Sequence, residues 1–171
     1  MASLREQWNK LRDQAVSMSP MEAAFIAIIL IAIPIDIISV YFGAVNPNEL
    51  QALKNLIKQT PLKELIYYQV ILNPIQEEII YRGLGRIFIF FFPPDTWFRK
   101  LLAWIIMLIP TYYWAVLAGG GGHGIPADAF FSGIVFSWIL IKTQSLESTV
   151  AIHSSYNAVN LAGALIKYRF L

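Results

Sequence analysis

The sequence contains no cysteine among its 171 residues. Disulfides, thiolate metal sites and a cysteine nucleophile are therefore excluded, and any catalysis depends on other groups. Charge is also scarce, because charged residues make up 14% of the chain and hydrophobic residues 57%. An ordinary soluble domain has about 25% charged residues, so this composition cannot cover a water-exposed surface. It indicates an integral membrane protein whose surroundings include the lipid bilayer.

The chain also lacks a concentrated basic surface. Thirteen Lys and Arg residues against eleven Asp and Glu residues give a net charge of +2, and the basic residues are scattered between apolar blocks. A nucleic-acid-binding protein instead gathers its basic residues into a patch or stripe. Nucleic acid is therefore excluded as an expected partner.

Apolar residues gather in blocks, which is the pattern that a bilayer about 30 Å thick selects. We expect an all-α polytopic bundle with five membrane-spanning helices. Residues 1–61 are expected to contribute a surface helix over 1–20, a first membrane anchor over 23–45 and an interfacial helix over 49–60, and residues 62–171 a core. The expected spanning segments are 23–45, 62–92, 101–118, 129–141 and 148–166.

The segment 62–92 is unusual because it carries ionisable side chains inside an apolar run. A charged residue at the centre of a membrane helix costs about 2.5–3.5 kcal/mol on insertion scales, so such groups need compensation. Glu78 and Arg82 are four residues apart, a spacing that favours an ion pair on one helix face. Glu77 lies about 100° round the helix and points elsewhere. It is therefore a candidate general base.

The only two histidines, His123 and His153, fall in other segments of the chain. Asn157 comes four residues after His153, so these two side chains share a helical face. A carboxylate, two imidazoles and an amide from three segments suit the activation of a water molecule and the stabilisation of an oxyanion. This combination predicts hydrolysis of an acyl bond.

The run from Glu77 to Gly83 (EEIIYRG) resembles the EExxxR motif of the CAAX-protease and bacteriocin-processing family of intramembrane endopeptidases. His153 to Asn157 (HSSYN) is similar to the HxxxN motif of that family, and His123 takes the place of its second-motif histidine. Gly119 stands where the family usually has an aromatic residue. The resemblance covers residues 62–166.

The resemblance implies a glutamate-dependent endopeptidase in a multi-pass protein, which we expect in a prokaryotic cell membrane. Glu77 with His123 would activate the attacking water, His153 with Asn157 would hold the oxyanion, and Glu78 would brace the site together with Arg82. The implied substrate is a peptide or protein at the membrane, prenylated in some members of the family.

Other interpretations stay open. The acidic pair and Arg82 could form a structural ion-pair cluster near the headgroups, and His153 with Asn157 could serve only to bond neighbouring helices. The protein would then be an inactive immunity or scaffold protein of the same fold, or a small proton-coupled carrier. Two histidines and two glutamates could also ligate zinc, but no HExxH motif is present, and we expect no cofactor.

Overall fold

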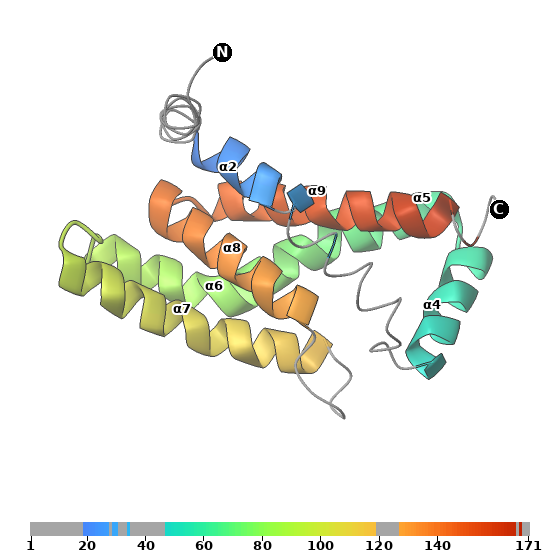
Figure 1. Cartoon of the computed structure of the whole chain (residues 1–171), viewed down its shortest axis with the longest axis horizontal. Coiled ribbons are helices and arrows are strands. Elements are labelled where there is room, and N and C mark those ends of the chain that lie inside the picture. The colour runs from blue at the N-terminus through green and yellow to red at the C-terminus, as the bar shows by residue number, and fades with distance from the viewer. Residues whose placement is uncertain are drawn as a thin grey trace, which may run out of the picture.

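The computed structural model describes residues 19–27, 29–30, 34, 47–118, 127–166 and 168. Every element in this part of the chain is helical, which confirms the prediction of an all-α protein there (Figure 1). The elements in order are α2 (Pro20–Ala27), α4 (Pro47–Gln59), α5 (Leu62–Leu65), the π-helix η2 (Ile66–Leu72), α6 (Asn73–Phe91), α7 (Trp97–Ala118), α8 (Ala127–Thr143) and α9 (Leu146–Leu165).

The four long helices α6 to α9 form the body of the bundle (Figure 1). Helix α7 packs against α6 and α8, and α9 packs against α6, α8 and η2. Helix α2 lies against α8 and α9, whereas α4 lies at the end of the bundle where α9 finishes (Figure 1). Because α6 contacts α7, α8 and α9, its side chains meet residues from all three partners.

Local sequence accounts for the ends of these helices. Pro61 precedes α5, and Pro93 follows the end of α6, where a proline cannot continue the helix. At the start of α9 the Ser145 hydroxyl accepts a hydrogen bond from the Ser148 N–H at 3.0 Å, which is an N-cap. Gln144, in the turn before it, has a φ of 54°, the left-handed conformation that reverses the chain between α8 and α9.

Two buried hydrophobic clusters hold the long helices together. The first surrounds the polar groups described below, and the second lies nearer the start of α7. The first is rich in aromatic rings, and the guanidinium of Arg82 on α6 lies over two of them, Trp114 and Phe136. The first cluster contains Trp114, Ala115, Ala129, Phe136, Ile139, Ile152 and Tyr156, and the second Ile89, Ala103, Met107, Leu140 and Ile141.

None of the helices in the described part of the chain is both long enough and apolar enough to cross a membrane. The prediction of spanning helices over 62–92, 101–118, 129–141 and 148–166 is therefore wrong. Helix α8 has only 17 residues, and α9 interrupts its apolar run with polar side chains such as His153 and Asn157. Helix α6 carries four charged residues, which are Glu77, Glu78, Arg82 and Arg86.

The N-terminal predictions are mostly outside the described residues. The surface helix expected over 1–20 and most of the anchor expected over 23–45 fall there. The interfacial segment expected over 49–60 does form a helix, α4. Its contact with a membrane and the division of the chain at residue 61 stay predictions.

Candidate active site

Helix α6 presents its two adjacent glutamates to different surroundings. Successive residues of an α-helix project about 100° apart, and here Glu78 is fully buried while 31% of the Glu77 side chain is exposed. The buried carboxylate is thus enclosed by protein groups. The exposed one is accessible to a water molecule or a substrate.

Glu78 is paired with Arg82 one turn later on the same helix. Arg82 Nη1 lies 3.3 Å from Glu78 Oε1, which is the ion pair expected from their spacing. The guanidinium carbon of Arg82 lies 5.0 Å from the ring centroid of Trp114 and 5.6 Å from that of Phe136. Both rings therefore stabilise the buried cation through their π faces.

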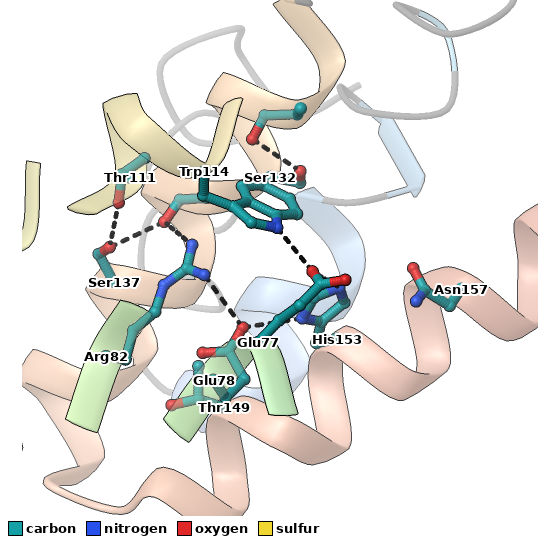
Figure 2. A network of polar contacts seen from close by, with 12 residues as sticks. Glu77, Glu78, Arg82, Thr111, Trp114, Ser132, Ser137, Thr149, His153 and Asn157 are labelled. Carbon is teal, nitrogen blue, oxygen red and sulfur yellow. Dashed lines mark hydrogen bonds and ion pairs between the residues drawn. The ribbon is translucent and has the colours of Figure 1, made fainter. Parts of the chain in front are cut away.

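Helices α7 and α8 fix the position of Arg82 through one backbone carbonyl. Arg82 Nη2 donates to the Gly133 oxygen at 3.4 Å. The same oxygen accepts from the Ser137 hydroxyl at 2.8 Å, and Ser137 in turn lies 3.0 Å from the Thr111 hydroxyl. The guanidinium is therefore held by a polar network that ties α6 to α8 and α7 (Figure 2).

Gly133 is where a side chain would disturb this network most. A Cβ atom there would lie 2.7 Å from Thr111 Cγ2, 3.0 Å from Arg82 Nη2 and 3.2 Å from the Trp114 ring. We expect Gly133→Ala to lower the free energy of unfolding by about 1–3 kcal/mol, the usual cost of overpacking. Chemical denaturation in one detergent measures this difference.

Gly83→Ala is the matched control, because a Cβ at Gly83 has nothing within 4 Å. This variant should equal or exceed the wild-type stability by up to about 1 kcal/mol, since alanine is the better helix former. Equal stability of the Gly133 and Gly83 variants would contradict the packing described around Arg82.

His153 on α9 lies between the two carboxylates of α6. Its Nδ1 is 2.8 Å from Glu78 Oε1, and its Nε2 is 3.6 Å from Glu77 Oε2. An ionised carboxylate only accepts hydrogen bonds, so Nδ1 is the donor to Glu78 and Nε2 faces Glu77. The imidazole also stacks on Phe136, with ring centroids 4.5 Å apart. Its position and its orientation are thus both fixed (Figure 2).

Trp114 is a site residue that the sequence reasoning missed. Its indole Nε1 donates to Glu77 Oε2 at 2.6 Å, and its ring meets the His153 ring edge-on at 5.7 Å. A tryptophan inside the apolar run 101–118 is typical of a hydrophobic core, so no local signal distinguishes it. Trp114 contacts Glu77, Arg82 and His153 and is the aromatic centre of the cluster.

Asn157 lies one turn further along α9 and bonds away from the carboxylates. Its Nδ2 donates to the backbone oxygen of Gln69 in η2 at 2.8 Å. At the end of η2 the N–H of Asn73, the first residue of α6, donates to Tyr68 O, and Pro74 has no N–H to offer. The Gln69 carbonyl therefore lacks both of its usual helical donors, and the Asn157 amide replaces them. Figure 2 shows Asn157 apart from Glu77 and His153.

The structure thus brings four of the six predicted residues together. Glu77, Glu78 and His153 form one contact group with Arg82. Asn157 is adjacent along α9 but bonds to η2, and residue 123, the other histidine, lies outside the described residues. Among the described residues, no group of three or more His, Cys, Asp or Glu side chains is arranged to hold a metal ion.

Comparison with known families places the chain in one of them. A family model described as type II CAAX prenyl endopeptidase Rce1-like matches residues 61–159. The chain belongs to this Rce1-like family. The matched range runs from the start of α5 to the last turns of α9 and includes all six predicted site residues. The resemblance read from the two motifs is therefore confirmed, and the family is one of proteases.

The other comparisons add no relatives. No curated protein and no solved structure matches the chain.

Proposed function

We propose that this protein is a membrane endopeptidase that hydrolyses peptide bonds with a water molecule activated by Glu77. One observation carries the proposal. The partly exposed Glu77 carboxylate lies 3.6 Å from the His153 imidazole, whose opposite nitrogen is bonded to the buried Glu78. An accessible base beside an oriented imidazole is an arrangement that general acid–base catalysis requires.

The buried residues Glu78 and Arg82 help to position the groups around the partly exposed Glu77. Glu78, neutralised by Arg82, holds His153 through Nδ1 and so directs Nε2 toward Glu77. The Trp114 N–H also orients the Glu77 carboxylate, through the same oxygen, Oε2, that His153 faces. Preorganised groups of this kind lower a reaction barrier because they need no rearrangement when charge develops.

The proposed reaction forms one bond and breaks another. Glu77 accepts a proton from a water molecule, whose oxygen attacks the carbonyl carbon of the scissile peptide bond. The tetrahedral oxyanion collapses, the C–N bond breaks, and the proton passes from Glu77 to the leaving amine. The products are a carboxylic acid and an amine. As implied by the family resemblance, His153 and Asn157 are proposed to stabilise the oxyanion, and His123 to assist Glu77.

Exposed apolar side chains support a membrane location for this activity. Several large residues at the α6 and α7 ends are more than half exposed, including Phe90, Phe91 and Trp97 at 67%, 68% and 76%. Monomeric soluble proteins rarely expose apolar patches of this kind. We propose that this surface contacts lipid and that the substrate is a membrane peptide, with prenylated C-terminal peptides as the class named by the family.

Cleavage of defined peptides by the purified chain in detergent tests this proposal. The panel contains a prenylated CAAX peptide, the same peptide without its prenyl group and unrelated membrane peptides, and mass spectrometry identifies the products. We expect cleavage of at least one peptide at one bond, with activity retained in a strong chelator. If no peptide is cleaved, the protein is a non-catalytic member of its family and the proposal is wrong.

A further inference from the structure

A pocket lies at the end of the bundle where α7 begins and α8 ends, opposite the end that carries α4 (Figure 1). Its volume is about 340 Å³, within the range of about 300–1,000 Å³ that is typical of small-molecule sites. The pocket is not lined by the four residues of the candidate active site, which are Glu77, Glu78, Arg82 and His153. Six of its lining residues matter here: Pro94, Lys100, Trp104, Trp138, Ile141 and Lys142.

The pocket carries positive charge that nothing in the described part of the chain neutralises. Neither Lys100 nor Lys142 forms an ion pair there, and Asp95, beside the pocket residue Pro94, already accepts two hydrogen bonds from Arg99 Nη1 at 3.0 and 3.1 Å. Lys100 also sits in the first turn of α7, which contains no acidic residue. A helix N-terminus carries partial positive charge, so the dipole of α7 does not stabilise the ammonium group of Lys100.

The remaining polar side chains of the pocket are two indole N–H donors and the amide of Gln144, which can both donate and accept. The indole N–H groups of Trp104 and Trp138 donate to no other group among the described residues. Both rings pack against the hydrophobic clusters, which fix their positions. Lysine and tryptophan side chains have donors and no acceptors. The pocket therefore suits a ligand that is anionic and rich in acceptors.

We propose that this pocket binds a phosphate ester. Its phosphate oxygens accept from the ammonium groups of Lys100 and Lys142, and its organic part lies on the indole rings and Ile141. Phosphate offers a compact charge with several acceptors, which matches two separate ammonium groups. Two sources share this chemistry, which are the headgroup of an anionic phospholipid and a soluble phosphate ester. The proposal is independent of the proposed peptidase activity.

Calorimetric titration of the purified full chain in a neutral detergent tests the site. The probes are glycerol 3-phosphate, mixed micelles containing phosphatidylglycerol, and mixed micelles containing phosphatidylcholine as the zwitterionic comparison. We expect Lys100→Gln with Lys142→Gln to weaken phosphatidylglycerol binding by at least about tenfold, since hydrogen bonds to charged groups are among the stronger ones. Both lysines are exposed, so the variant should keep the wild-type melting temperature.

The control variant removes the same charge elsewhere. Lys54→Gln with Lys58→Gln changes two lysines of α4, at the other end of the bundle, and should bind as the wild type does. Binding of both anionic probes identifies a site for phosphate esters in general. Binding of phosphatidylglycerol alone identifies a lipid headgroup as the ligand. The proposal is overturned if neither anionic probe binds the wild type, or if the control variant loses as much affinity as the pocket variant.

Discussion

Glu77→Gln should lower kcat/KM for peptide cleavage by about 10²–10⁴-fold, the usual contribution of a general base. Glutamine keeps the size of the side chain and an oxygen that can accept the Trp114 N–H, but it cannot take a proton from water. The protein should remain folded, because 31% of the Glu77 side chain is exposed. Initial rates on the cleaved peptide and a thermal melt of the same sample measure both effects.

Glu64→Gln is the matched control for this substitution. Glu64 lies on α5, is exposed and lies outside the cluster around His153. Its loss should leave the rate unchanged. A Glu77→Gln protein that retains more than a tenth of the wild-type rate would remove Glu77 from its proposed role.

Arg82→Met should cause the largest loss of stability of any single change in the cluster. Arg82 and Glu78 are both fully buried, so removing the guanidinium leaves a buried carboxylate without its cation. Breaking a buried ion pair from one side costs about 3–5 kcal/mol. Denaturant unfolding should show this loss, whereas Arg99→Met, which breaks the exposed pair with Asp95, should cost at most about 1 kcal/mol.

The double variant Glu78→Gln with Arg82→Met separates this explanation from simple loss of packing. With the carboxylate neutralised, most of the stability lost in Arg82→Met should return, because replacing both partners of a buried pair is often nearly neutral. If the double variant is no more stable than the single one, the loss comes from the contacts of the arginine with Trp114 and Phe136 instead.

Local parts of the site were predictable from the sequence because they depend on helix geometry alone. The four-residue spacing of Glu78 and Arg82 predicted their ion pair. The rotation of about 100° between successive helical residues predicted that the Glu77 carboxylate would face a different environment. Two motif resemblances also predicted the family. These features require no knowledge of which helices are neighbours.

Contacts between helices were not predictable in the same way. The expectation grouped His153 with Asn157, but in the structure His153 bonds to Glu78 while Asn157 bonds to Gln69. The partner of each side chain depends on the rotation of α9 against α6, which periodicity does not encode. The bond from Trp114 to Glu77 joins residues 37 positions apart and was missed for the same reason.

The π-helix η2 was missed because its cause is not a local residue preference. The expected continuous helix over 62–92 is divided into α5, η2 and α6. Pro74 shows in the sequence that one backbone N–H donor is missing from this helix. The replacement of that donor by the Asn157 amide could be predicted only from the packing of α9 against η2.

The central claim is that the cluster around Glu77 activates water directly. The most direct test follows a single turnover in H₂¹⁸O by intact-mass spectrometry of both the protein and the peptide products. We predict that the new carboxylate carries ¹⁸O and that the mass of the protein stays constant throughout the turnover. A transient adduct on the protein, or an absence of cleavage, would contradict the account.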